Sequence, residues 1–261
     1  MTFFAVSNLE KEFGGLSALD GVSFTLYKND IVGVIGPNGA GKSTLFNCIT
    51  GYLQPTGGGI KFKNHSVTGV EPEELAQRGL VRTFQIPKVF PTMTVLENVM
   101  VAAKDHPGER LYGGLVGPEE SDQYERQIEE RAIELIEDFN LKRVMHEYAS
   151  NISGGQRKLL DLCRALMVDP DLLLLDEPFA GVQEELVKEI SDQIKRLHES
   201  GVTIMIIEHG IETLVDIVDR MIVLDNGAVL ADGDPEAVVN NREVLETYIG
   251  DIDQPIVEEG P

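Results

Sequence analysis

Short stretches of apolar and β-branched residues recur along the chain and predict strands. The first three lie at residues 3–7, 22–26 and 31–35, and a glycine-rich turn follows the last of them. Residues 42–50 then carry the pattern of a helix, which Gly51 closes. The N-terminal part of the chain is therefore expected to form strands, the last of which leads through a turn into a helix.

The alternation of strands and helices returns in the second half of the chain. The run LLLLDEP (172–178) predicts a strand, and residues 184–200 predict a helix. Further strands are expected at 202–207 and 220–225. Strands that alternate with helices favour a mostly parallel sheet with helices on both faces. The apolar face of the predicted helix consists of Leu186, Ile190, Ile194 and Leu197.

The middle of the chain, near residues 92–148, differs from the rest in its composition and its pattern of charged residues. A Gly/Pro-rich loop (HPGERLYGGLVGPEE) precedes a strongly charged helical run at 122–139. One face of that run is apolar, which predicts a helical insertion between two halves of an α/β core. The residues of that face are Ile128, Ala132, Leu135, Ile136 and Phe139.

The end of the chain predicts a hairpin, because Asn226 and Gly227 both tolerate positive φ and lie between two apolar runs. The last residues, 252–261, are polar and are expected to fray. Together these patterns predict a single domain. Its core is expected at 1–90 and 159–225, a helical subdomain at 91–158, and a C-terminal hairpin, helix and tail at 226–261.

Length and composition agree with one domain that has a subdomain, because 261 residues with 42% hydrophobic residues can bury one large core. No apolar run reaches the roughly 18 residues of a membrane span. The N-terminus lacks the pattern of a secretion signal, so a cytosolic location is expected. The two cysteines, Cys48 and Cys163, lie in apolar helical patterns typical of buried reduced thiols.

The charge is strongly negative. The 22 basic residues are outnumbered by 44 acidic ones, which gives a net charge of −22 and disfavours nucleic acid as a partner. The acidity fits an ordinary solvated surface. It also fits adaptation to a cytosol with high salt, where dense carboxylates keep a protein hydrated.

The most informative motif is GPNGAGKST at residues 36–44, directly after a predicted strand and before a predicted helix. Its glycines let backbone N–H groups converge on phosphate oxygens, the lysine reaches the β and γ phosphates, and the serine hydroxyl binds Mg²⁺. By chance such a match occurs in about one chain in a hundred of this length. The residues expected to bind ATP here are Gly36, Pro37, Asn38, Gly39, Ala40, Gly41, Lys42, Ser43 and Thr44.

A second motif is the apolar run that ends in two carboxylates, LLLLDEP. This arrangement places one acid on the metal and the next near the attacking water. Asp176 is the predicted metal ligand and Glu177 the predicted general base. An apolar strand that ends in charged residues is common. The motif therefore indicates an ATPase only because the phosphate loop is present in the same chain.

Between these motifs lies ISGGQRK (152–158), and here the chain resembles the ABC ATPases, whose signature is usually LSGGQ ahead of a helix. The resemblance spans nearly the whole chain. It implies a phosphate-loop ABC ATPase core with N-terminal antiparallel strands and a helical insertion. It also implies a nucleotide-sandwich dimer in which the signature of one subunit contacts ATP bound to its partner. The signature residues are Ser153, Gly154, Gly155 and Gln156.

The resemblance assigns three more residues. Gln85, after the strand pattern VRTFQ, corresponds to the glutamine that senses Mg²⁺ and couples to the membrane subunit. His209 in IIEHG corresponds to the switch histidine, and both residues would assist the γ-phosphate chemistry. Phe13 matches the aromatic position that stacks on adenine, although a phenylalanine here could equally belong to the core. The segment FAGVQEE departs from the family pattern, with Gln183 where an acidic residue is frequent.

The opening FGGLSALDGVSF, the segment VAAKDHPGERL and the ending LETYIG resemble ATPase subunits of branched-chain amino-acid importers. The signature differs from many of these, which carry an aromatic residue in place of Gly154. This resemblance implies a second ATPase subunit, two transmembrane permease subunits and, indirectly, a substrate-binding protein. The location it implies is peripheral, on the cytoplasmic face of the cell membrane. ATPases of urea and lipopolysaccharide systems are similar.

Two other classes compete with a transport ATPase. A non-transport ABC ATPase acting on DNA or ribosomes usually has long coiled coils or tandem ATPase domains, and the sequence shows neither. A phosphate-loop GTPase or kinase would leave the signature and His209 unexplained, and no NKxD-type guanine motif follows the phosphate loop.

Overall fold

The computed structural model describes residues 2–104 and 118–252. Most of the Gly/Pro-rich loop and nearly all of the polar tail expected from the sequence lie outside the described residues. Contacts divide the chain into two compact units, Met1–Leu75 with Leu197–Pro261 and Ala76–Arg196. The predicted subdomain boundaries at 91 and 158 stay a prediction.

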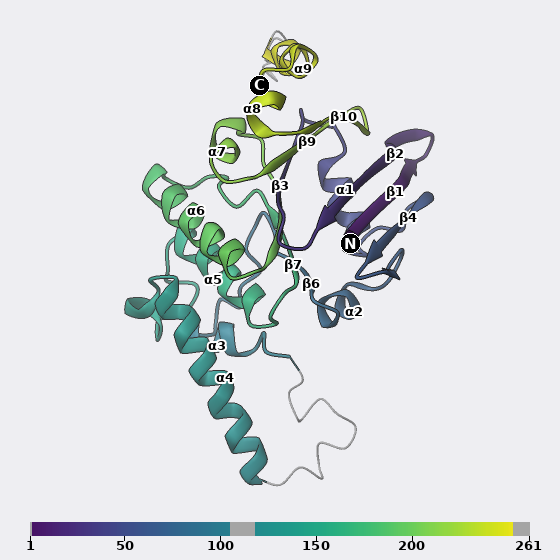
Figure 1. The fold of residues 1–261 in the computed structure, drawn as a ribbon. Helices are drawn as coiled ribbons and strands as arrows, with labels where there is room; N and C mark the ends of the chain where they lie inside the picture. Colours follow the sequence, from purple (N-terminus) through teal and green to yellow (C-terminus); the bar gives the residue numbers. More distant parts are fainter. Residues whose placement is uncertain (1, 105–117, 253–261) are drawn as a thin grey trace, which may run out of the picture. The chain divides into compact units, whose positions relative to one another are not determined.

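The first unit contains an antiparallel sheet in the order β2-β1-β4-β5 (Figure 1). Phe4, Val6 and Leu9 of β1 are buried. Phe24 and Phe62 pack beside Phe4, with ring centroids 6.3 and 6.5 Å from that of Phe4. The strands extend further than the sequence pattern predicts, because both strands of the hairpin continue to the turn at residues 14–15. They are β1 (Thr2–Phe13), β2 (Leu16–Tyr27), β4 (Gly57–Phe62) and β5 (His65–Ser66).

The first unit also holds strands in the order β10-β9-β3-β8. β3 (Ile31–Ile35) pairs in parallel with β8 (Thr203–Ile207) and with β9 (Arg220–Asp225), and every residue of β3 and β8 is buried. Continuous burial is expected of parallel strands that are covered on both faces. The hairpin to β10 (Ala228–Gly233) is confirmed, since Asn226 and Gly227 have φ of 46° and 81°.

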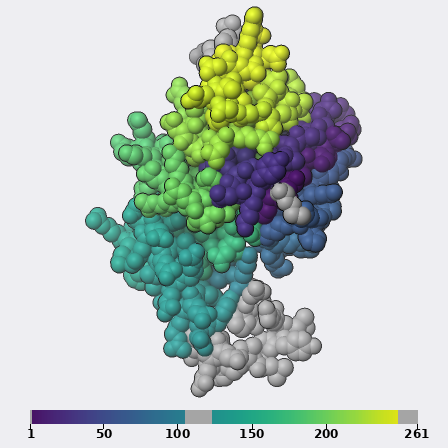
Figure 2. Space-filling model, in the orientation of Figure 1, coloured from purple at the N-terminus to yellow at the C-terminus, as the bar shows by residue number. Residues whose placement is uncertain are grey.

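Helices α1 (Lys42–Ile49), α7 (Ile211–Val215), α8 (Pro235–Val239) and α9 (Arg242–Ile252) complete the first unit. The N-terminal and C-terminal segments of this unit contact each other: Arg220 donates to the carbonyl oxygen of Thr25 at 2.7 Å, and β10 contacts β2. Figure 2 shows the yellow C-terminal segment beside the purple N-terminal strands. None of the helices within 2–104 and 118–252 is long and apolar enough to cross a membrane.

The second unit contains β6 (Leu80–Arg82) and β7 (Leu172–Asp176), which pair in parallel. The predicted helical run is confirmed as α4 (Pro118–Asp138), and its predicted apolar face is buried throughout. The helix expected at 184–200 is α6 (Glu184–Glu199), with Ile190 and Ile194 fully buried. The remaining elements of this unit are α3 (Val95–Met100), the 3₁₀ turn η3 (Lys142–Val144) and α5 (Gly154–Leu166), while α2 (Pro72–Gln77) begins in the first unit and ends in the second.

Both cysteines are buried thiols, as expected. Burial raises the pKa of the Cys48 and Cys163 thiols, which keeps them in the protonated, unreactive form.

Candidate functional site

The phosphate loop forms the turn between β3 and α1 in the first unit. Lys42 is the first residue of α1, and its ammonium donates to the carbonyl oxygens of Gly36 at 2.6 Å and Pro37 at 3.0 Å. The side chain is buried and folded back over the loop. These contacts hold a positive charge inside the turn, at the helix end where an anion is favoured.

Two glycines of the loop have no room for a side chain. A Cβ at Gly41, whose φ is 99°, would lie 2.5 Å from the carbonyl oxygen of Ala18. A Cβ at Gly36 would lie 2.2 Å from the carbonyl oxygen of Leu224. The turn therefore keeps its backbone close to the neighbouring strands, a packing that only glycine allows at these two positions.

His209 follows β8, the strand next to β3 in the first unit. Val34 pairs with Ile207, so the carboxyl ends of both strands lie at one edge of the sheet. His209 is exposed there, and its backbone N–H donates to the carboxylate of the buried Glu208 at 3.3 Å. The structure thus places His209 and the phosphate loop at the same sheet edge, where ligands of parallel sheets usually bind.

Phe13 is the last residue of β1 and is 44% exposed, so it is not a core residue. The Lys11 ammonium lies 5.0 Å from the ring centroid. An exposed ring at a strand end suits base stacking. Its role in adenine binding stays a prediction.

In the second unit, Gln85 and Glu177 follow the paired strands β6 and β7. Val81 pairs with Leu173, and the Thr83 N–H donates to the carbonyl oxygen of Leu174 at 3.0 Å, which carries the parallel register past the end of β6. The Gln85 amide donates to the Glu177 carboxylate at 2.5 Å. The structure therefore brings these two predicted site residues into direct contact.

Asp176 is buried at the end of β7 and bonds to a residue that the sequence reading missed. The Arg82 guanidinium lies 2.6 Å from one Asp176 oxygen, and both side chains are about nine-tenths buried. A buried carboxylate is stabilised by such a partner. The signal in the sequence was the position of Arg82 at the end of the neighbouring strand, but an arginine there is common.

The predicted metal ligands are Ser43, Gln85 and Asp176. A hydroxyl, an amide oxygen and a carboxylate are the oxygen donors that Mg²⁺ prefers, so the donor set fits this ion. Ser43 belongs to the first unit, and Gln85 and Asp176 belong to the second.

Glu177 has an unusual backbone. Its φ is 49°, in the left-handed region that residues other than glycine rarely adopt. The Lys158 ammonium, on α5, donates to the carbonyl oxygens of Glu177 at 3.0 Å, Pro178 at 3.2 Å and Ala180 at 2.6 Å. Lys158 is a second residue that was not predicted from the sequence, since a lysine after the signature looks like any other residue of a helix.

The signature loop forms the N-terminus of α5. Ser153 caps the helix, with its hydroxyl accepting from the Gln156 N–H at 3.2 Å and its own N–H donating to the Gln156 side chain at 2.9 Å. A Cβ at Gly154 would meet nothing within 4 Å, whereas one at Gly155 would lie 2.0 Å from a Leu186 methyl group. Ser153 and Gly154 are both exposed.

Farther along α5, Asp161 is a buried carboxylate. Burial raises the pKa of Asp161 to about 6, while Arg164, the Phe84 N–H and Lys88 oppose that rise. Together with Lys158, Asp176 and Glu177, it lines a small pocket at the ends of β6 and β7. No motif in the sequence marked this residue.

Comparisons with known proteins agree with this arrangement. The family model described as "ABC transporter" matches residues 19–180. A branched-chain amino acid transport ATP-binding protein of Pseudomonas aeruginosa is 38% identical over 247 residues, covering 94% of this chain and 97% of that protein. A solved ATP-binding cassette of an ABC transporter in its ADP conformation is 38% identical, with a TM-score of 0.82, and the match covers 96% of this chain and 99% of that one.

A second solved cassette is a dimer in a post-hydrolysis state with ADP and phosphate bound. It is 26% identical, with a TM-score of 0.73, and the match covers 89% of this chain and 99% of that one. The predicted fold class, a mixed α/β cassette with an N-terminal antiparallel sheet, is confirmed by these likenesses.

Proposed function

Because this chain belongs to the ABC transporter family and is an ATP-hydrolysing subunit that powers transport, we propose that it drives import of branched-chain or other amino acids. The observation that carries the proposal is the 38% sequence identity, over 94% of the chain, to a branched-chain amino acid transport ATP-binding protein. The similarity covers 247 residues and so extends well beyond the catalytic motifs.

In the proposed mechanism, two ATPase subunits close over two ATP molecules. The phosphate loop of one subunit and the signature residues Ser153, Gly154, Gly155 and Gln156 of the other enclose each nucleotide. This proposal is supported by the solved dimeric cassette and by the exposure of Ser153 and Gly154 at a capped helix N-terminus. Closure moves the membrane subunits, and hydrolysis reopens the dimer.

The chemistry is assigned to residues at the two sheet edges. Glu177 accepts a proton from the attacking water, Gln85 orients that carboxylate, and His209 contacts the γ phosphate. Lys42 and the loop N–H groups bind the phosphates, and Phe13 stacks on the adenine. Ser43, Asp176 and Gln85 would hold Mg²⁺, which when bound neutralises charge on the phosphate oxygens.

The proposed partners are a second ATPase subunit, two permease subunits and, through them, a substrate-binding protein. Exposed apolar side chains offer a surface for a permease: Ile86, next to Gln85, is 79% exposed, and Met93, Met100 and Val101 line a groove beside α3. This surface would place the chain on the cytoplasmic face of the membrane. It also connects the permease to the loop that carries Gln85.

Two alternatives stay open beside amino-acid import. Urea and lipid systems use similar ATPases, and the cargo does not touch this subunit. A non-transport ABC ATPase acting on nucleic acid is disfavoured by the net charge of −22.

Transport in proteoliposomes tests the proposal. The chain is co-purified with its second ATPase subunit and its permease subunits and is supplied with the substrate-binding protein and ATP. Uptake of radioactive leucine is then compared with uptake of urea. We expect ATP-dependent leucine uptake that is lost in Lys42→Met, since this change removes the charge that reaches the phosphates. Uptake of urea without leucine would overturn the proposed cargo, and strong stimulation of ATP hydrolysis by DNA would revive the non-transport alternative.

A further inference from the structure

One face of α5 is turned toward the residues assigned to hydrolysis. Lys158, Asp161 and Arg164 are spaced three residues apart, so they lie along one side of the helix. Each of them contacts one of the two loops that carry Gln85 and Glu177. We call these three residues the α5 bracket.

Lys158 holds the turn that carries Glu177. Its ammonium is shared by three carbonyl oxygens within four residues, those of Glu177, Pro178 and Ala180, at 2.6–3.2 Å. Three donors on one ammonium match three acceptors, and such charge-assisted bonds are strong. The turn they hold includes the left-handed backbone of Glu177, at φ 49°, which a non-glycine residue keeps only when its surroundings impose it.

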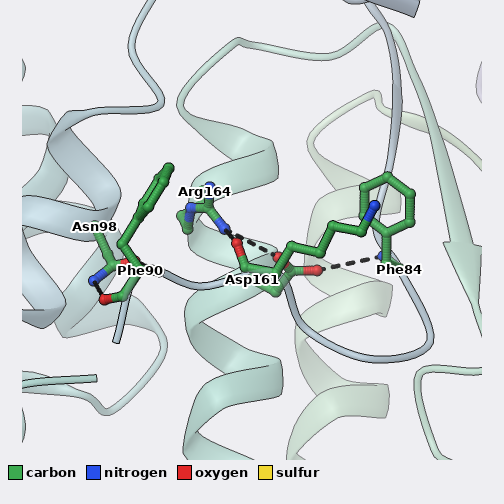
Figure 3. A network of polar contacts seen from close by, with 6 residues as sticks. Phe84, Phe90, Asn98, Asp161 and Arg164 are labelled. Atoms are coloured by element: carbon green, nitrogen blue, oxygen red, sulfur yellow. Dashed lines mark hydrogen bonds and ion pairs between the residues drawn. The ribbon is translucent and has the colours of Figure 1, made fainter. Parts of the chain in front are cut away.

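Asp161 and Arg164 hold the loop that carries Gln85. Asp161 accepts a long hydrogen bond, 3.4 Å, from the Phe84 N–H, directly before Gln85. Arg164 donates to the Lys88 carbonyl oxygen and lies 5.2 Å from the centroid of the Phe90 ring. Figure 3 shows the Asp161–Arg164 pair between Phe84 and Phe90, so the loop is bonded to α5 on both sides of Gln85.

The far end of the same loop is fixed by α3. The buried Asn98 accepts from the Phe90 N–H at 2.7 Å and donates to the Phe90 carbonyl oxygen at 3.0 Å (Figure 3). It also donates to the carbonyl oxygen of Thr94 at 2.9 Å. Between these anchors, Gln85 and Ile86 are exposed. The loop is therefore held at its ends and leaves Gln85 at the surface.

We propose that Lys158, Asp161 and Arg164 are positioning residues that keep Gln85 and Glu177 within bonding distance of each other. The bracket rests on the proposed function, because it acts through residues assigned there to hydrolysis. The signature loop, which contacts the partner's ATP, lies at the start of α5. The same helix therefore joins the signature loop to the loops of Gln85 and Glu177, which act on the chain's own nucleotide.

The test compares Lys158→Met, which keeps the length and the helix propensity but removes the three donors, with Lys158→Arg, which keeps the charge. We expect Lys158→Met to lower kcat roughly 10- to 100-fold while KM for ATP changes less than about 3-fold. Lys158→Arg should recover part of kcat. Lys195→Met, which removes an exposed lysine on α6, is the matched control and should keep wild-type kcat.

Arg164→Met tests the other loop and should lower kcat with the same small change in KM. Wild-type kcat in both Lys158→Met and Arg164→Met would overturn the bracket. So would a rise in KM that equals the whole loss in kcat/KM, because that result means weaker ATP binding rather than misplaced residues. Glu177→Gln separates the two claims: if it is inactive while Lys158→Met and Arg164→Met are both fully active, the bracket fails alone, and if it hydrolyses ATP normally, the proposed function fails.

Discussion

The Gln85 amide donates to the Glu177 carboxylate at 2.5 Å, which joins two residues 92 positions apart in the chain. The bond lies where β6 and β7 end, and it orients the carboxylate that we assign as general base. Gln85 thereby connects the hydrolytic residue to the exposed loop that begins at Ile86.

Replacing Gln85 with Ala should lower kcat for ATP hydrolysis roughly 10- to 100-fold, because the carboxylate loses the group that orients it. KM should change little, since ATP is bound by the phosphate loop. Steady-state kinetics measure both constants. Gln127→Ala, at an exposed position of α4, is the matched control, and equal kinetics in the two variants would refute the role of Gln85.

The two signature glycines should differ in their tolerance of a methyl group. Gly155→Ala should destabilise the fold by about 1–3 kcal/mol, because its Cβ would lie 2.0 Å from a Leu186 methyl group. Gly154→Ala should change stability by less than about 1 kcal/mol, since its Cβ meets nothing within 4 Å. Urea unfolding of both variants measures the difference, and equal losses would contradict the packing described for Leu186.

Asp161 should make stability depend on pH. Burial raises its pKa from 3.8 to about 6, so the folded protein binds this proton more tightly than the unfolded chain does. The stability linked to the proton is present below the unfolded pKa and is lost as pH rises through the folded one. The difference between 3.8 and about 6 corresponds to about 3 kcal/mol.

Comparison with Asp161→Asn isolates this group from the other carboxylates. The free energy of unfolding of the wild type, relative to that of the variant, should fall between about pH 4 and about pH 7. The cations that lower the pKa of Asp161 are Arg164 on its own helix and Lys88 on the loop. A relative stability that rises with pH would mean that these cations outweigh burial.

The melting temperature should rise from low to multimolar KCl. A net charge of −22 produces self-repulsion in the folded state, and salt screens it. Thermal unfolding followed across KCl concentration measures the effect. An unchanged melting temperature would remove the hypothesis that the acidity is an adaptation to high salt.

Much of the fold could be predicted from local patterns. β3, β8 and β9 are apolar runs bounded by turn residues, and Asn226-Gly227 fixes its hairpin through positive φ at both residues. β4 was missed because GGGIKF begins with three glycines, which argue against a strand when read alone. It forms because β1 offers a partner, a pairing between distant segments that no local pattern records.

The candidate site shows the same limit. The phosphate loop, Asp176 and Glu177 were recognisable because their chemistry requires a fixed order of residues. Arg82 and Lys158 were not, since each acts through a contact with another strand or turn: Arg82 with Asp176, and Lys158 with three carbonyl oxygens after β7. Such contacts depend on the fold, and an arginine or lysine carries no mark of them in the sequence.

The central claim is that two subunits share each site. It is tested by measuring ATP hydrolysis by the purified wild-type chain and by Glu177→Gln over a range of protein concentrations. The size of each protein is measured in the presence of ATP and Mg²⁺. We predict turnover per chain that rises cooperatively with concentration, and a Glu177→Gln variant that is inactive and held by ATP at twice the 28.7 kDa mass of one chain. Turnover per chain that is independent of concentration in a monomer, or that survives in Glu177→Gln, would contradict it.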